Sequence, residues 1–220
     1  MTSANTPPPR GKFITFEGGE GVGKTTNVQW CADWLMERGL EVMVTREPGG
    51  TPIAELIRNK LLKAHHAESM VPMAELLLVF AARVQHLEAV ILPALSQGTW
   101  VLCDRFTDST IAYQGFGRGL DLGSIETLKN LAQGTLEPDC TLLLDAPVDV
   151  GMARARGRTA ISGEDIDRFE TEQMAFFERV RDGFQALAAT QARFVTLDAT
   201  QSLDDIQSEL AIRLSLLSGL

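Results

Sequence analysis

The sequence of 220 residues has little of what marks several classes of protein. It has only three cysteines, Cys31, Cys103 and Cys140, which are odd in number, far apart and in no paired motif. This pattern predicts buried free thiols in a reducing compartment and argues against a disulfide scaffold. The three histidines, at positions 65, 66 and 86, have no metal-ligand spacing, and we expect them at the surface.

Long apolar runs and an excess of positive charge are also missing. No segment approaches 18 consecutive apolar residues, so we expect none to span a membrane. The formal net charge of −9 argues against general binding to nucleic acid or to an anionic membrane. The length suits a single domain with a sizeable core. Residues 1–11 contain three consecutive prolines and predict a disordered tail, which leaves residues 12–220 as one domain.

Strand patterns alternate with helical patterns along the chain. Strands are expected at residues 13–16, 41–45, 100–103, 140–144 and 194–197, and helices at 24–38, 52–63, 72–97, 124–133 and from Ser202 onward. Thr51 and Pro52 suit the start of a helix, and Pro93 is expected to kink or end the long one. The alternation predicts an α/β fold in which helices cover both faces of a parallel five-stranded sheet.

The strongest motif follows the first expected strand. A Gly, four further residues and then Gly-Lys-Thr is the pattern of a phosphate-binding loop, and a helical pattern follows it. The alternative is a glycine-rich turn without function that matches the motif by chance, but the strand–loop–helix context favours the phosphate-binding loop. Lys24 would reach the β- and γ-phosphates, and the Thr25 hydroxyl would bind Mg²⁺. The residues expected to hold the phosphates are Gly18, Gly19, Glu20, Gly21, Val22, Gly23, Lys24, Thr25 and Thr26.

Carboxylates and arginines at strand ends could complete a reaction site. Asp104 and Asp145 both end an apolar strand, and either could serve Mg²⁺. Asp104 is favoured because Arg105 follows it at a strand end where ligands bind in such sheets. Arginines that could pair with phosphates are numerous and together favour phosphoryl transfer between two phosphorylated molecules: Arg46, Arg105, Arg118, Arg154, Arg156, Arg158 and Arg168.

A glycine-containing, charged segment at about residues 157–168 lacks clear periodicity. Such a segment between helices can act as a mobile lid over a site. A solvated loop is the alternative, and the pattern leaves both open.

Together these segments resemble bacterial thymidylate kinases, from about residue 12 to the C-terminus. The resemblance rests on the phosphate loop preceded by Phe16-Glu17, on Arg46-Glu47-Pro48-Gly49-Gly50-Thr51, on Phe80-Ala81-Ala82-Arg83, on Asp104-Arg105-Phe106, on Ser109 to Gly115 and on Asp167-Arg168-Phe169-Glu170. It implies a phosphate-loop NTPase three-layer sandwich of the nucleoside monophosphate kinase type with a lid. It also implies phosphorylation of dTMP by ATP with Mg²⁺, cytoplasmic localisation and a homodimer, without nucleic-acid or membrane partners.

The resemblance implies a role for each matching residue in the dTMP site. Phe80 would stack on thymine, although periodicity alone favours core packing for it. Arg83 would donate to a thymine carbonyl, Glu20 would accept from the sugar 3′-hydroxyl, and Tyr113 would exclude a 2′-hydroxyl. The residues so implied are Glu20, Arg46, Pro48, Phe80, Arg83, Arg105, Ser109, Tyr113 and Gln114.

The family has two arrangements of its catalytic basic residue. The variable positions of the phosphate loop, Gly19 to Val22, contain no basic residue, so the resemblance implies the lid type. In that type Arg156 or Arg158 would be catalytic beside Lys24 and Arg105, and Arg154 would contact ATP. The segment Asp198-Ala199-Thr200 resembles the loop beside adenine. Two rivals stay open: a kinase for another nucleoside monophosphate, and a phosphate-loop ATPase that acts on a protein partner.

Overall fold

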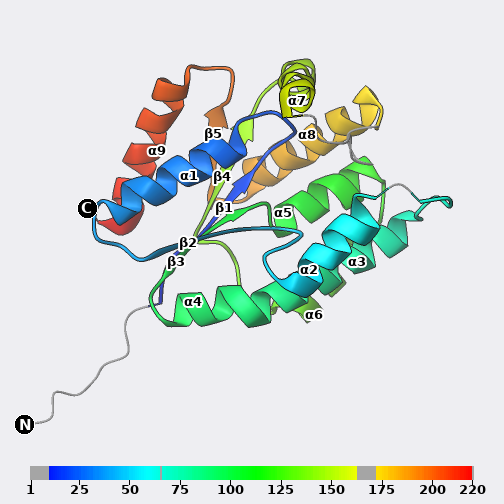
Figure 1. Ribbon diagram of the computed structural model, residues 1–220, viewed down its shortest axis with the longest axis horizontal. Helices are drawn as coiled ribbons and strands as arrows, with labels where there is room; N and C mark the ends of the chain where they lie inside the picture. Colours follow the sequence, from blue (N-terminus) through cyan, green and yellow to red (C-terminus); the bar gives the residue numbers. More distant parts are fainter. Residues whose placement is uncertain (1–9, 65, 163–171, 220) are drawn as a thin grey trace, which may run out of the picture.

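The computed structural model describes residues 10–64, 66–162 and 172–219. Within them, five strands form one sheet in the order β2-β3-β1-β4-β5, and every neighbouring pair is parallel (Figure 1). The five expected strands are confirmed, with ends that differ by at most one residue. The strands are β1 (Phe13–Glu17), β2 (Val42–Arg46), β3 (Trp100–Asp104), β4 (Cys140–Asp145) and β5 (Phe194–Asp198).

Helices follow or separate the strands, as the alternating sequence patterns predict. Three π-helical segments, η1 to η3, continue α-helices without a break in the chain. The helical elements are α1 (Lys24–Met36), α2 (Pro52–Leu56), η1 (Ile57–Leu62), α3 (Pro72–His86), η2 (Leu87–Ile91), α4 (Leu92–Ser96), α5 (Thr107–Thr110), η3 (Ile111–Gly117), α6 (Leu122–Gln133), α7 (Val148–Ser162), α8 (Met174–Thr190) and α9 (Leu203–Ser218).

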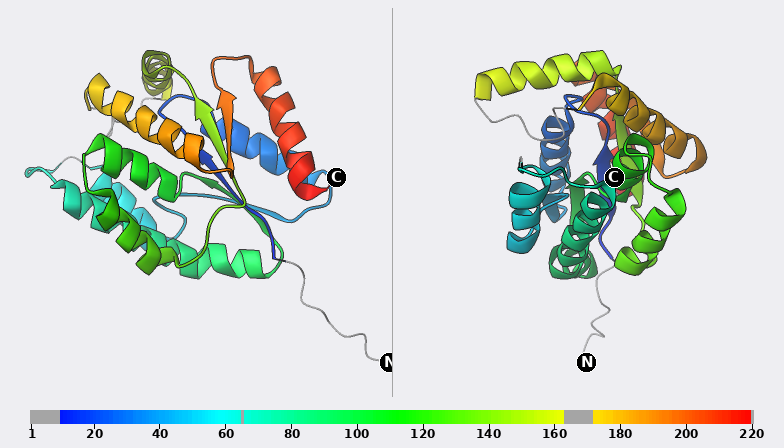
Figure 2. Two further views of the ribbon diagram at one scale, coloured as in Figure 1. Left: turned by 180° about the vertical axis from the view of Figure 1, so that it is seen from behind. Right: turned by 90° about the vertical axis from the view of Figure 1, so that its right-hand side faces the viewer.

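The three central strands, β1, β3 and β4, are buried because they place apolar side chains alternately on both faces of the sheet. Ile14 and Phe16 pack in one cluster with residues of α1 and α9. Phe13 packs on the opposite face with residues of η2 and α4, and Leu143 packs there with residues of η3 and α8. Figure 2 shows the sheet between these two helical layers. The expected three-layer α/β sandwich is therefore confirmed.

The register brings the functional loops to one edge of the sheet. Arg46, at the end of β2, pairs with Asp104, at the end of β3, and Asp104 also pairs with Phe16 in β1. The carboxyl ends of these three adjacent strands therefore lie side by side. The phosphate loop follows β1, the Glu47–Thr51 loop follows β2, and Arg105 follows β3.

Residues 72–96 form one continuous helical stretch, in which Pro93 does not end the helix. The wider π-helical turn η2 stands before α4, and Pro93 occupies the first turn of α4, where a missing N–H costs little. By length and composition the stretch could cross a membrane, since 18 consecutive residues of it have a mean hydropathy of 1.6. It nevertheless buries Glu75, Arg83 and His86 inside the domain, which is how a core helix behaves.

Three expectations need correction. Arg10 and Gly11, expected in the tail, contact the domain: Arg10 pairs with Asp139, and the Gly11 amide donates to the Leu95 carbonyl. Residues 157–162 were expected in a loop but continue the helix α7. Gly157 is exposed on this helix, and a Cβ added there would meet no atom within 4 Å. His86, expected at the surface, is fully buried. His66 is exposed, and the three cysteines are free and buried as expected.

Candidate active site

A cavity of about 520 Å³ opens at the carboxyl ends of β1, β2 and β3. Its volume is that of a typical small-molecule site, and it lies where ligands bind in open α/β sheets. Its walls come from the phosphate loop, from the loop after β2, from η1 and α3, and from the segment after β3. They are formed by Glu20, Gly21, Val22, Gly23, Lys24, Thr25, Thr26, Glu47, Pro48, Arg58, Leu62, Lys63, Val79, Arg83, Asp104, Arg105, Phe106, Ser109, Thr110, Tyr113 and Gln114.

The phosphate loop packs tightly under α7. A Cβ added at Gly21 would come within 2.0 Å of the Gly151 carbonyl oxygen, and the Gly21 φ of 68° also favours glycine. Beyond the loop, α1 starts at Lys24, so its first amides face the cavity end of the loop. This is the arrangement in which a helix N-terminus and a glycine-rich loop bind phosphate.

Lys24 is held by the loop itself. Its Nζ donates to the carbonyl oxygens of Gly18, at 3.1 Å, and Gly19, at 2.6 Å. Burial lowers the pKa of Lys24 to about 8, and the nearby Arg105 guanidinium lowers it further while Glu20 and Asp104 oppose the change. A phosphate beside Lys24 would stabilise the charged ammonium that burial disfavours. The site is therefore suited to an anion.

Arg105 occupies a strained position at the centre of the cavity wall. Its φ of 67° places a residue other than glycine in the left-handed region. Its Nη2 donates to Glu20 at 2.6 Å, and its Nη1 donates to the Gly18 carbonyl at 2.9 Å. Burial alone would lower the pKa of Arg105, but Tyr113, Glu20 and Asp104 raise it above its ordinary value. Arg105 therefore stays charged beside the phosphate loop.

Glu17, the last residue of β1, holds the segment after β3 through hydrogen bonds to Phe106 and Ser109. The Phe106 amide donates to one oxygen of the buried carboxyl group at 2.7 Å, and the Ser109 hydroxyl donates to the other at 2.5 Å. Burial raises the pKa of Glu17 to about 8, with a further contribution from Asp108. Ser109 also accepts from Arg105 at 3.2 Å. Sequence reasoning missed Glu17 because it ends an ordinary strand pattern.

Asp104 and Thr25 are the residues best suited to Mg²⁺. Both line the cavity with Lys24, and Oδ1 of Asp104 is buried without a hydrogen-bond partner in the part of the chain that the structure describes. A carboxylate oxygen and a hydroxyl are ligands that Mg²⁺ accepts. Asp145, the alternative, instead pairs with Arg181 at 2.7 and 2.8 Å. The geometry favours Asp104, as the sequence did.

Arg83 is fixed in the opposite wall of the cavity. Its Nε donates to Glu47 at 2.7 Å and its Nη2 donates to Thr110 at 2.9 Å, while only 1% of the residue is exposed. The remaining nitrogen, Nη1, is buried and has no hydrogen-bond partner among the described residues. A buried unpaired donor is costly, so this nitrogen is suited to a ligand carbonyl.

Phe80 does not take the position that the resemblance implied. Within the described residues, the cavity wall from α3 contains Val79 and Arg83 but not Phe80. Phe80 packs with Leu76 and Ile125 in a separate core cluster, and its ring centroid lies 4.9 Å from the Arg83 guanidinium carbon. Val79 and Arg83 are four positions apart and share a helical face, and Phe80 lies about 100° around the helix from Val79. The structure therefore supports core packing and contact with Arg83 for this ring.

The arginine at the end of β2 is also displaced from the cavity wall. Arg46 pairs with Glu55 at 2.8 Å, and 48% of its side chain is exposed. Arg58 of η1, which sequence reasoning missed, lines the cavity and donates to the Pro48 carbonyl at 2.9 Å. Burial lowers the pKa of Arg58, and the positive charges of Arg46 and Arg105 lower it further. Arg58 and Arg105 therefore both line the cavity, where two positive charges suit an anion.

The remaining expected contacts line the same cavity. The Tyr113 hydroxyl donates to Glu20 at 2.8 Å, and its ring meets Phe176 edge-on at a centroid distance of 6.1 Å. Gln114 is buried and donates to Glu75 at 2.9 Å. Pro48 and Ser109, which were also expected to contact dTMP, line the cavity as well.

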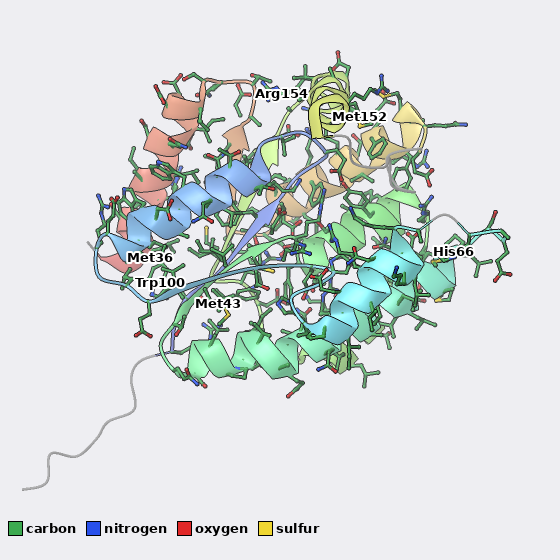
Figure 3. The ribbon with its side chains drawn as sticks, viewed as in Figure 1. Met36, Met43, His66, Trp100, Met152 and Arg154 are labelled. Carbon is green, nitrogen blue, oxygen red and sulfur yellow. The ribbon has the colours of Figure 1, made fainter. Side chains whose placement is uncertain are left out.

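Arg154 and Arg156 of α7 do not line the described part of the cavity wall. Nη1 of Arg154 donates to the Ala199 carbonyl at 2.7 Å, which joins α7 to the loop expected beside adenine (Figure 3). Arg156 is exposed on the same helix. Arg158 lies in α7, but its side chain is outside the described part, and Arg168 is outside it altogether. Arg118 pairs with Glu75 and Glu172.

Comparison with known proteins identifies the family. The sequence model described as thymidylate kinase matches residues 16–210. The chain belongs to the thymidylate kinase family. It is therefore a nucleoside monophosphate kinase, and so a phosphotransferase.

Individual members of the thymidylate kinase family match along nearly their whole length. The chain is 55% identical over 206 residues to a thymidylate kinase of Chromohalobacter salexigens, covering 93% of this chain and 95% of that one. It is 53% identical over 211 residues to one of Methylococcus capsulatus, covering 95% and 98%. A crystal structure of thymidylate kinase from Ehrlichia chaffeensis matches with a TM-score of 0.73 and 35% identity, over 94% of this chain and 99% of that one.

Proposed function

We propose that this chain transfers the terminal phosphoryl group of ATP to dTMP and so forms dTDP. One observation carries the choice of acceptor: the cavity that contains the phosphate loop also contains a locked arginine, Arg83, with one unpaired buried nitrogen. A phosphate-loop ATPase acting on a protein needs no such buried donor. A base carbonyl would satisfy it.

The phosphate groups of both substrates would lie between the cations of the cavity. Lys24 and the first amides of α1 would bind the β- and γ-phosphates of ATP. Arg105 and Arg58 would bind the acceptor phosphate from the opposite side, with Arg46 close by. An oxygen of the acceptor phosphate would attack the γ-phosphorus in line, and positioning with charge stabilisation would supply most of the catalysis.

Mg²⁺ fits beside Asp104 and Thr25 and would neutralise charge on the β- and γ-oxygens when bound. The unpaired buried Oδ1 of Asp104 supports this assignment. The lid arginines, Arg156 or Arg158, would add positive charge near the transferred group, because the loop residues Gly19 to Val22 contain no base. Residues 157–168 would act as the lid.

The nucleoside of dTMP would face the other wall. Arg83 would donate to a thymine carbonyl beside Val79, Pro48 and Gln114. The Tyr113 ring would occupy the space of a ribose 2′-hydroxyl, and Glu20 would accept from the 3′-hydroxyl.

A homodimer is the assembly that the surface supports. The stretch from α3 to α4 exposes an apolar stripe at Met73, Leu77, Val84 and Leu92, with exposed fractions of 39% to 50%. These positions are spaced by four to eight residues and so share one helical face.

We place the enzyme in the cytoplasm without nucleic-acid or membrane partners, because its thiols are free and its net charge is negative.

A coupled assay across nucleoside monophosphates tests the proposed acceptor. We expect dTMP to have the highest kcat/KM, with dUMP measurable because one methyl group is worth about 1–3 kcal/mol in a fitted pocket. We expect dCMP, UMP and purine monophosphates to be poor. A wild-type enzyme that prefers UMP or dCMP would contradict the acceptor while leaving the kinase assignment intact.

A further inference from the structure

A buried network of polar groups extends from Arg83 and Glu47 in the cavity wall to His86 and Thr45, which do not line the described cavity. Nε of Arg83 donates to one oxygen of Glu47, and the other oxygen lies 3.1 Å from Nδ1 of His86. Nε2 of His86 lies 2.7 Å from the hydroxyl of Thr45. These contacts therefore connect Thr45 of β2, through His86 of α3 and Glu47, to Arg83 in the cavity wall.

The surrounding loop seals this chain of contacts. His86 is fully buried and Glu47 is 3% exposed. A Cβ at Gly50 would lie 2.4 Å from Nε2 of His86 and 2.8 Å from Oγ1 of Thr45, so the loop covers both groups with no space to spare. The φ of 81° at Gly50 excludes most other residues as well. The imidazole is thus confined to one position.

The geometry fixes which groups donate. The Glu47 carboxylate is paired with Arg83 and can only accept, so Nδ1 of His86 carries the hydrogen that faces it. In the neutral ring, Nε2 is then the acceptor of the Thr45 hydroxyl. Each oxygen of Glu47 thereby has its own donor, which prevents the carboxylate from turning. Because Glu47 and Thr110 hold two nitrogens of Arg83, the direction of the third is set by the same contacts.

We propose that His86 is a positioning residue for base recognition, acting through Glu47 on Arg83. The proposal rests on the proposed function, in which Nη1 of Arg83 binds the base. Without the imidazole, Glu47 loses one donor and gains freedom to rotate, so Arg83 no longer presents Nη1 in one direction. Loss of position should weaken dTMP binding and reduce discrimination, while the phosphate side of the cavity continues to work.

Two substitutions at one position separate positioning from packing. In His86→Asn the amide nitrogen falls near Nδ1 and can still donate to Glu47. In His86→Gln it falls near Nε2, where it donates to the Thr45 hydroxyl oxygen instead of accepting from it, and the contact with Glu47 is lost. Both variants disturb the same buried volume, so a purely structural role predicts similar losses from both.

The measurements are kcat and KM for dTMP and dCMP, with thermal unfolding of each purified variant. For His86→Gln we expect KM for dTMP to rise about tenfold and the dTMP/dCMP ratio of kcat/KM to fall by a similar factor, with kcat within about threefold of wild type. For His86→Asn we expect KM and the ratio to stay within about twofold of wild type. A wild-type KM and ratio in His86→Gln would overturn the proposal, as would equal losses in both variants.

A milder variant covers the case in which the substitutions at His86 do not fold. Thr45→Val keeps the shape of its side chain but removes the hydroxyl that holds Nε2, and we expect a smaller rise in KM for dTMP at unchanged kcat. Unchanged KM and base ratio in folded Thr45→Val would then overturn the proposal. The wild-type substrate panel keeps the two claims apart: a wild type that does not prefer dTMP contradicts the proposed function, whereas normal preference that survives these variants contradicts only the positioning role.

Discussion

The two sides of the cavity hold their cations in different ways. On the phosphate side, Lys24 donates to two backbone carbonyls, and Arg105 divides its donors among a backbone carbonyl, Ser109 and Glu20. On the base side, Arg83 is paired with the buried carboxylate of Glu47 and with Thr110, which are both nearly inaccessible. The phosphate-side contacts are neutral or partly exposed, whereas the base-side contact is a buried ion pair.

This difference indicates a division of labour. A cation held by neutral carbonyls can turn toward phosphate at little cost, so it can follow charge that moves during transfer. A cation locked by a buried carboxylate cannot reorient cheaply, because breaking that pair leaves an uncompensated buried charge. The phosphate side should therefore govern kcat, and the base side should govern which nucleotide binds.

The largest effect is expected from Lys24→Ala. Removing an oriented cation from a buried site lowers rate by on the order of 10²–10³. We expect this loss mainly in kcat, measured with purified enzyme at saturating ATP and dTMP. Near-normal turnover in Lys24→Ala would contradict the assignment of residues 18–25 as the phosphate-binding loop.

A smaller loss is expected on the phosphate side when both lid arginines are replaced. Arg156→Ala combined with Arg158→Ala should lower kcat by on the order of 10² with little change in dTMP affinity. The companion measurement is the Kd for dTMP by calorimetry. If affinity were lost and the maximal rate were kept, these residues would serve binding and not phosphoryl transfer.

Tyr113 allows a test that separates its ring from its hydroxyl. Tyr113→Leu should narrow the preference for dUMP over UMP by about tenfold, because the smaller side chain leaves space for a 2′-hydroxyl. Tyr113→Phe keeps the ring and removes the hydroxyl that donates to Glu20, so its preference should match wild type. Equal preferences in the two variants would show that the ring does not select the sugar.

The smallest expected effect is on stability at Glu17. Its pKa of about 8 in the folded protein lies above the ordinary 4.5, so the folded state retains a proton that the unfolded state releases. The free energy of unfolding should therefore fall as pH rises from about 4.5 to 8, and Glu17→Gln should flatten this slope. Urea unfolding at several pH values measures the difference, and identical slopes would contradict the buried, protonated carboxyl group.

Sequence reasoning succeeded where a feature depends on local pattern. Strand periodicity and the glycine spacing of residues 18–25 predicted the sheet and the phosphate loop, and the capping of α2 by Thr51 is confirmed, since its hydroxyl accepts from the Ala54 amide. Asp104 was favoured over Asp145 from the local position of a strand end, and its role at a metal stays a prediction that its buried Oδ1 supports.

It failed where tertiary contacts decide. The resemblance placed Phe80 against the base, although periodicity favoured core packing for it, and only the tertiary arrangement shows that Val79 lines the cavity while Phe80 packs in the core. Arg58 and His86 sit in ordinary helical patterns, and only the loop after β2 brings them to the site or buries them. The Arg46 side chain is drawn to Glu55 by a pairing between separate elements.

One comparison tests the division of labour most directly: the dTMP/dCMP ratio of kcat/KM in Lys24→Ala and in Arg83→Lys, measured by single turnover with labelled ATP. Arg83→Lys keeps a positive charge for Glu47 but loses the guanidinium fork. The account predicts that Lys24→Ala slows both substrates and leaves their ratio within about threefold of wild type. It predicts that Arg83→Lys lowers the ratio by at least about tenfold. A ratio that collapses in Lys24→Ala, or one that survives in Arg83→Lys, would contradict it.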